Sequence, residues 1–290
     1  MLLAAVVGVL SAGAAAADDP LSSGELRRLG QALGARRVSP PRTTTRAGLE
    51  QTYPRIVKAV PFVVTRGGSG SAYVVSVDAA TGEAIVVTNH HVVDQAFQEG
   101  GQSWVLLVFH HPELAKSPFS TQRILGCKAE KSAWCEAFRR SVRRAHVIVT
   151  DAGRDLALLR TGELPEGVAK LPHAPLAGVR PGQAAVVVGH PMDLLWTITT
   201  GIVSAVREQF PVEASPSHMT VVQTQAAINP GNSGGPLMNT DGEVIGVIFS
   251  KRRSAEGLNF AIGINEVDAF VAAASSKKAV RGPDERNPKR

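Results

Sequence analysis

The chain contains very little cysteine. Cys127 and Cys135 are the two cysteines among 290 residues, and neither a C-x-x-C pair nor paired histidines stand beside them. Two thiolates do not complete the four ligands of a structural zinc site, so we expect no metal, and no motif points to an organic cofactor. In an exported protein a pair this close would form one short disulfide loop, whereas in the cytosol the two residues would be free thiols.

Charge is also scarce. Charged residues make up 19% of the chain and hydrophobic residues 44%, a balance typical of a packed globular protein. The net charge is +6, but residues 277–290 alone hold six basic and two acidic residues, so the rest of the chain is nearly balanced. The basic character therefore gives no reason to expect a nucleic acid partner.

A long apolar run stands at the start of the chain. Residues 1–17 end in Ala15-Ala16-Ala17 before two aspartates, which predicts a signal peptide and an exported protein, periplasmic or secreted. The alternative is an uncleaved anchor, since about 17 apolar residues approach the lower limit for a membrane span. Residues 18–51 are rich in Gly, Pro, Ser, Thr and Arg, which predicts a disordered linker.

One loop is built almost without large side chains. It runs from Asn229 to Leu237 with the sequence NPGNSGGPL and stands between two apolar runs. Its glycines allow backbone conformations that other residues resist. Ser233, in the middle, has the accessible hydroxyl and the neighbouring N–H groups that a nucleophile and an oxyanion site need.

A nucleophilic serine needs a base and a group that orients the base. The base candidate is His91 in the run VVTNHHVVD, and the carboxylate candidate is Asp155 at the start of the apolar run DLALLR. The order His, Asp, Ser along the chain is that of the chymotrypsin-type triad.

Three motifs, TNHHVV, DLALL and QTQAAINPGNSGGPL followed by GLNFAI, together resemble the HtrA (DegP-like) family of trypsin-fold serine peptidases. The similarity runs from about Ile56 to about Phe270. It implies an all-β fold of two six-stranded antiparallel β-barrels, with the active site in the cleft between them and a short C-terminal helix. Short apolar segments separated by turn signals favour the same fold class.

The resemblance also divides the chain. The peptidase domain would cover residues 52–273, with a first barrel at about 56–161 and a second at about 183–263, followed by a basic disordered tail, 274–290. Relatives usually carry a C-terminal PDZ domain, and we expect this chain to lack one. Relatives are often trimers, so a homo-trimer is a further expectation.

Roles for the site residues follow from the resemblance. His91 would be the base, Asp155 would orient it and Ser233 would attack the scissile carbonyl. The oxyanion hole would comprise Gly231, Asn232 and Ser233, with the N–H groups of the first and last as donors.

The resemblance also places a substrate pocket. Ala227 would lie at its base, with Ile248, Phe249 and Ser250 in its wall. No aspartate stands at the base to pair with a basic substrate residue, so we expect an apolar residue before the scissile bond.

Other residues compete for these roles. His90 adjoins His91 but would point the other way in an extended segment. Asp94 and Asp151 are alternative carboxylates; Asp151 stands before the turn Ala152-Gly153 and lacks a following apolar strand.

Further polar residues lie outside the predicted site. Ser69 and Ser71 stand in a second glycine-rich stretch, which we interpret as structural. We interpret His190 as a loop residue.

The insert, residues 110–144, departs most from the family pattern. It holds both cysteines and a basic run, and its composition from residue 130 onward is helical. It could cap the cleft or, like the tail, bind an anionic partner; alternatively it is a surface excursion held by a disulfide.

Three functions fit these observations. The first is a serine endopeptidase acting on polypeptides, unfolded proteins among them. The second is a binding or scaffold protein that uses the same fold without turnover. The third, an esterase of the α/β-hydrolase type, is disfavoured because a β-run follows Ser233 where that fold has a helix, and because His and Asp precede the serine.

Overall fold

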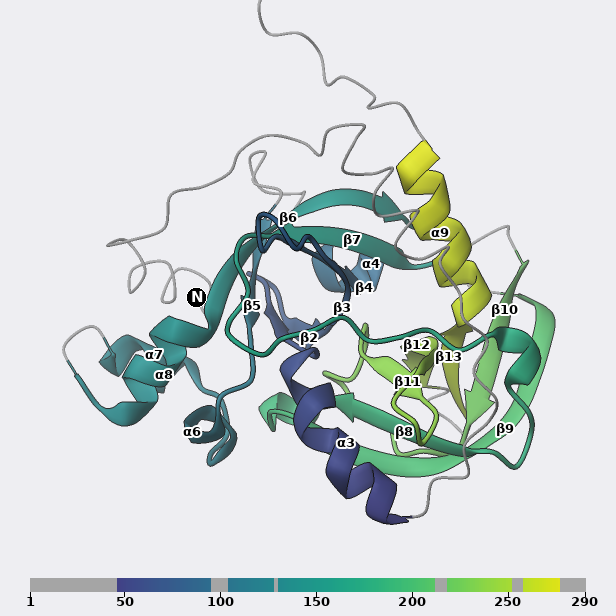
Figure 1. Cartoon of the computed structure of the whole chain (residues 1–290), viewed down its shortest axis with the longest axis horizontal. Helices are drawn as coiled ribbons and strands as arrows, with labels where there is room; N and C mark the ends of the chain where they lie inside the picture. Colours follow the sequence, from purple (N-terminus) through teal and green to yellow (C-terminus); the bar gives the residue numbers. More distant parts are fainter. Residues whose placement is uncertain (1–45, 95–103, 128–129, 212–217, 252–257, 277–290) are drawn as a thin grey trace, which may run out of the picture.

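The computed structural model describes residues 46–94, 104–127, 130–211, 218–251 and 258–276 (Figure 1). The predicted signal peptide, most of the predicted linker and the tail beyond Ser276 lie outside these residues. No helix in the described ranges is long and apolar enough to cross a membrane. Two antiparallel β-sheets form the body of the protein, which confirms the predicted fold class.

The first sheet has seven strands in the order β2-β1-β5-β6-β7-β4-β3. Six strands were predicted. The extra strand arises because the chain changes its pairing partner at Ala72, so that β2 pairs with β1 while β3 pairs with β4. The edge strands are thus consecutive in sequence, and Ala72 connects the two edges of the sheet. The strands are β1 (Phe62–Val64), β2 (Ser69–Ser71), β3 (Tyr73–Val77), β4 (Ala84–Thr88), β5 (Trp104–Val108), β6 (Val142–Asp151) and β7 (Leu156–Thr161).

The second sheet is a closed six-stranded barrel, as predicted, in the order β10-β13-β12-β11-β8-β9. Its strands are β8 (Ala184–Gly189), β9 (Thr197–Pro211), β10 (His218–Thr224), β11 (Pro236–Met238), β12 (Val244–Lys251) and β13 (Asn259–Gly263). Two short 3-10 helices, η1 (Leu176–Gly178) and η2 (Pro191–Asp193), interrupt the connecting loops.

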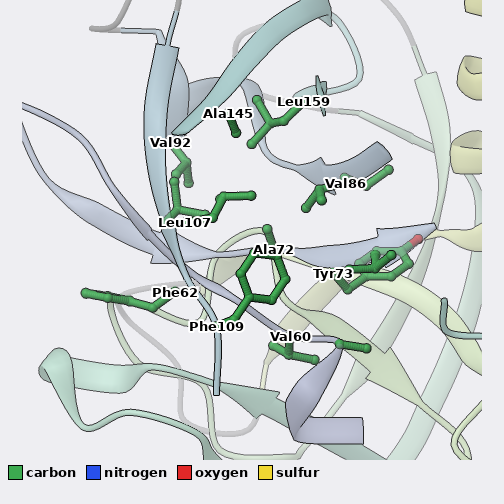
Figure 2. Close-up of a cluster of buried hydrophobic side chains, with 14 of the residues drawn as sticks. Val60, Phe62, Ala72, Tyr73, Val86, Val92, Leu107, Phe109, Ala145 and Leu159 are labelled. Atoms are coloured by element: carbon green, nitrogen blue, oxygen red, sulfur yellow. The ribbon is translucent and has the colours of Figure 1, made fainter. Parts of the chain in front are cut away.

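Buried aliphatic and aromatic side chains hold the first sheet together, because most of its strands contain few polar residues and many Val, Leu and Ile. Figure 2 shows part of this cluster, in which Phe62, Tyr73 and Phe109 are fully buried. Val92 belongs to the same cluster, although it lies beyond the end of β4.

Two longer helices border the sheets (Figure 1). Helix α3 (Arg46–Lys58) begins six residues before residue 52, where the peptidase domain was expected to start. Residues 46–51 are therefore helical where a linker was predicted. Its C-terminal end is fixed to the first sheet, because the Val74 N–H donates to the Ala59 carbonyl. Helix α9 (Ile264–Ser276) is the predicted C-terminal helix and packs against β12 and β13.

The insert forms three short helices to one side of the first sheet, on the left in Figure 1: α6 (Pro112–Ala115), α7 (Thr121–Gly126) and α8 (Ala133–Ser141). A disulfide joins Cys127 to Cys135. The helical composition predicted from residue 130 is realised in α8, whereas residues 142–144 belong to β6.

The insert is packed against the body of the protein. Phe119 contacts Trp134 and Phe138 on α8 and also Phe62 on β1. The Phe119 N–H donates to the carbonyl of Asp193 at 3.1 Å, in the loop between β8 and β9. The insert therefore supports that loop, and an anionic partner for its basic side chains stays a prediction.

Candidate active site

The predicted base and carboxylate meet in the first sheet. His91 Nδ1 and Asp155 Oδ2 are 2.7 Å apart, and the His91 backbone N–H donates to Asp155 Oδ1 at 2.9 Å. Each carboxylate oxygen is thereby bonded to His91, Oδ1 to the backbone and Oδ2 to the ring. This leaves Nε2 as the ring nitrogen that is free to take a proton from a nucleophile.

Strand pairing explains why two residues 64 positions apart meet. Strand β4 leads directly to the histidine, Asp155 stands one residue before β7, and these strands pair with Thr88 opposite Ala157. After β4 the chain forms the short helix α4 (His90–Val93), whose Val92 and Val93 are buried. Burial of the valines turns His91 outward, and 46% of its side chain is exposed.

Asn89 completes this half of the site, and sequence reasoning missed it. Its side-chain amide donates to the Asp155 carbonyl at 2.9 Å. Asp155 has a φ of 54°, a left-handed conformation that aspartate tolerates better than most residues. The hydrogen bond from the Asn89 side-chain amide holds this turn in place. The available signal was a polar residue between an apolar strand and the histidine pair.

The competing residues have other roles. Asp151 receives the Arg154 guanidinium at 2.8 Å and its backbone N–H at 3.0 Å, so its carboxylate is already occupied. Asp94 contributes charge near His91 without a hydrogen bond to it among the described residues. His90 Nδ1 is buried, and the structure gives it no partner within the described ranges.

The electrostatics suit a base. Burial lowers the pKa of His91, but the hydrogen bond and the charge of Asp155, with a contribution from Asp94, outweigh it, so that the pKa lies above its ordinary value of 6.5. A carboxylate beside an imidazole favours the charged ring in this way. The protonated state that forms when a serine proton is taken up is thereby stabilised.

The Ser233 loop is held by backbone bonds to both sheets. The Ser71 N–H in β2 donates to the Ser233 carbonyl at 2.8 Å, and the Gly234 N–H donates to the Ile248 carbonyl in β12 at 2.8 Å. Ser233 therefore lies at the junction of the two sheets.

Gly234 brings this loop against the segment that carries the base. Its φ is +84°, and a Cβ there would overlap the Ser71 carbonyl and the Thr88 hydroxyl and would lie 3.1 Å from the Asn89 nitrogen. Only a glycine permits so close an approach. The structure thus brings the nucleophile candidate beside the His91 segment.

The third bond of a triad is not formed here. Among the described residues, neither Ser233 Oγ nor His91 Nε2 has a hydrogen bond. Such bonds are often long in enzymes without substrate and tighten when the substrate binds.

The peptide group before Gly231 sets the direction of the Gly231 N–H. The Pro230 carbonyl accepts from the Met192 N–H at 2.9 Å, so in a trans peptide the Gly231 N–H points away from Met192. Gly231 has a φ of +101°, and a Cβ would overlap the His190 carbonyl. A side chain at this position would displace the loop.

Two N–H groups of this loop are available. Those of Gly231 and Ser233 have no acceptor in the described part of the chain, whereas the Asn232 N–H donates to the Asn229 carbonyl at 3.0 Å. The Asn232 side chain is 1% exposed, and its amide has no partner within that same part. Of the three predicted oxyanion residues, the first and last carry the free donors.

The predicted pocket residues lie in different surroundings. Ala227 is exposed, Phe249 is partly buried, and Ile248 is fully buried in the core of the second barrel. The Ser250 backbone pairs with Phe260 in β13, and its side chain lies outside what the structure describes. Ile248 therefore contributes its backbone carbonyl to the Ser233 loop rather than a surface to a pocket.

Known proteins resemble the chain in sequence and fold. A family model for the trypsin-like peptidase domain matches residues 68–247. "Serine protease Do-like HtrA" of Bacillus subtilis is 31% identical over 226 residues, covering 76% of this chain and 42% of that protein. "Probable periplasmic serine endoprotease DegP-like" of a Marinomonas species is 40% identical over 123 residues, covering 41% of this chain and 25% of that protein.

A solved structure adds the fold. The HtrA-type protease AlgW with tripeptide has a TM-score of 0.54 and 26% identity, covering 79% of this chain and 64% of that chain. The chain spans less than half the length of the two curated relatives, 42% and 25%.

Proposed function

Because the chain belongs to the HtrA family of trypsin-fold serine peptidases, we propose that it is a serine endopeptidase that cuts polypeptides through an acyl-enzyme on Ser233. The observation that carries this proposal is the bonded His91–Asp155 pair beside a loop in which two N–H groups have no acceptor among the described residues. A base that is oriented by a carboxylate and a preformed oxyanion site are the two requirements of acyl transfer.

The proposed reaction assigns one task to each group. Ser233 Oγ attacks the scissile carbonyl while His91 Nε2 takes the serine proton. The N–H groups of Gly231 and Ser233 donate to the oxyanion of the tetrahedral intermediate. His91 then gives the proton to the leaving amine, and water, activated by the same ring, releases the acyl group. Asp155 keeps the Nδ1–H tautomer in place.

The substrate class is part of the proposal. Unfolded polypeptides are the proposed substrates, with an apolar residue before the scissile bond, because no acidic side chain stands at Ala227. Export is proposed on two grounds: the apolar start of the sequence and a relative that is named as periplasmic. A disulfide between Cys127 and Cys135 fits an oxidising compartment.

The test is cleavage of unfolded casein by the purified protein beside a Ser233→Ala variant. Cleavage by the first alone supports the proposal, and the new chain ends then test the preference for an apolar residue.

A catalytically silent scaffold is the second candidate, and the missing bond between Ser233 and His91 is the observation that favours it. A fluorophosphonate separates the two, because it labels only an activated serine. If the protein neither cleaves casein nor reacts with the reagent, the peptidase proposal fails.

A further inference from the structure

A chain of hydrogen bonds crosses from β8 to the first sheet and on to the Ser233 loop. His190 Nδ1, directly after β8, lies 2.9 Å from the Ser71 hydroxyl in β2. The same hydroxyl donates to the Gly231 carbonyl at 2.7 Å. His190 and Ser71 are fully buried. In the sequence, Ser71 is 119 positions from His190 and 160 positions from Gly231.

Proton counting fixes the direction of this chain. A carbonyl oxygen only accepts, so the single hydroxyl proton of Ser71 goes to Gly231. His190 Nδ1 must then carry the proton that it donates to Ser71. Burial, and next the nearby His110, lower the pKa of His190 to about 3, so the ring is neutral at ordinary pH and its buried Nε2 carries no proton.

The ring of His190 is itself held in place. Its centroid lies 5.1 Å from that of Phe62 and 5.5 Å from that of Trp196, whose indole N–H donates to the Val60 carbonyl. The donor is therefore presented to Ser71 by a packed aromatic shell rather than by a loose side chain.

Both peptide groups of Gly231 are consequently fixed. The carbonyl before it, of Pro230, is held by Met192, and its own carbonyl is held by Ser71. The Ser71 backbone N–H also holds the Ser233 carbonyl. Ser71 of the first sheet thus donates to the carbonyls of the two residues that flank Asn232.

We propose that Ser71 and His190 are positioning residues that keep the Gly231 and Ser233 N–H groups aimed at the substrate oxyanion. This inference rests on the proposed peptidase function. Without the hydroxyl, the carbonyl of the Gly231–Asn232 peptide loses its donor. This peptide lies between the two residues whose N–H groups are proposed to face the oxyanion, so its rotation would displace both donors. The effect falls on the transition state, where the charge develops, and hardly on the bound substrate.

The test compares two matched substitutions at His190. His190→Asn puts an amide N–H near the place of Nδ1–H, whereas His190→Leu has a similar size and no donor. Ser71→Ala removes the hydroxyl. Ser69→Ala is the control, because this neighbouring hydroxyl bonds Asp193 and not the Gly231 carbonyl.

For each variant kcat and KM are measured on one peptide substrate, together with the affinity of a peptide boronic acid. Boron accepts Ser233 Oγ, the serine proton passes to His91, and a boron-bound oxygen occupies the oxyanion site. Ser71→Ala and His190→Leu should lower kcat about tenfold to a hundredfold with KM little changed, and weaken boronate binding by a similar factor. His190→Asn should restore most of both.

Thermal unfolding of every variant shows whether it is folded. Loss of activity in proportion to lost stability, a rise in KM alone, or equal loss with His190→Asn and His190→Leu would overturn the inference. A wild-type protein that neither binds the boronate nor reacts with a fluorophosphonate overturns the proposed function and the inference with it. If the wild type is active and Ser71→Ala has the same kcat and boronate affinity, only the inference fails.

Discussion

The two halves of the site are held in different ways. His91 and Asp155 lie at the ends of neighbouring strands, so the pairing of β4 with β7 brings them together. Ser233 and Gly231 lie on a loop that is fixed by Ser71 from the other sheet and by Met192 from the loop before β9. The base half is therefore organised within one sheet, and the nucleophile half depends on the docking of two sheets and a loop.

The two halves should therefore lose different properties when they are substituted. A change in the base half acts on proton transfer and leaves the loop intact. A change around the loop alters donor geometry and leaves the pairing of His91 with Asp155 intact. Kinetic measurements that report separately on proton transfer and on donor geometry test this difference.

The largest effect is expected in the base half, from Asp155→Asn. It should lower kcat by about 10⁴-fold, because the amide no longer holds the productive tautomer or stabilises the charged ring. His91 acts as a base when neutral, so wild-type kcat/KM should fall as the pH drops through a pKa above 6.5. Without the carboxylate, the acid limb of the residual activity should move to lower pH. A limb that stays in place would contradict the assignment of Asp155.

A smaller effect is expected in the nucleophile half, from Gly231→Ala. The new Cβ would meet the His190 carbonyl, so the loop must shift, and kcat should fall about 10²- to 10³-fold through loss of one oxyanion donor. The pH of the acid limb should stay where it is. Gly178→Ala is the control, because a Cβ there meets no atom within 4 Å. Wild-type turnover by Gly231→Ala would show that this N–H is not used.

The smallest effect is expected from the insert. Replacing Cys127 and Cys135 by serine should lower the free energy of unfolding by about 2.5 kcal/mol, since the closed loop is short. Urea unfolding of the wild type, with and without a reductant, gives the same comparison without mutation. Because the insert supports the loop at Asp193 and not the His91–Asp155 pair, the acid limb should not move.

Sequence reasoning went furthest where contacts follow strands. The apolar runs beside His91 and Asp155 predicted two strands, and the family resemblance placed both residues in the first barrel. The family resemblance implied the six-stranded second barrel, and short apolar runs separated by turns favoured the same fold class. The seventh strand of the first sheet was missed, because no local sequence pattern marks the change of pairing partner at Ala72.

The polar residues around the nucleophile were harder to predict. Ser71 was interpreted as structural and His190 as a loop residue, since neither has a local pattern that indicates its partner. Asn89 could have been noticed from its place next to the histidine. Ile248 was placed in a pocket wall, and its side chain is fully buried in the core of the second barrel.

The amino-acid sequence alone is enough to name the proposed reacting groups: a serine in a glycine-rich loop, a histidine after an apolar strand and an aspartate before another, in the order that one family uses. Chemistry and local strand pattern are written in a few adjacent residues, so they can be recognised without coordinates. Only the tertiary structure decided how the Ser233 loop is held, because Ser71, His190 and Gly231 meet through the docking of a sheet and a barrel. Contacts between such distant residues depend on the shape of the whole core, which no local pattern encodes.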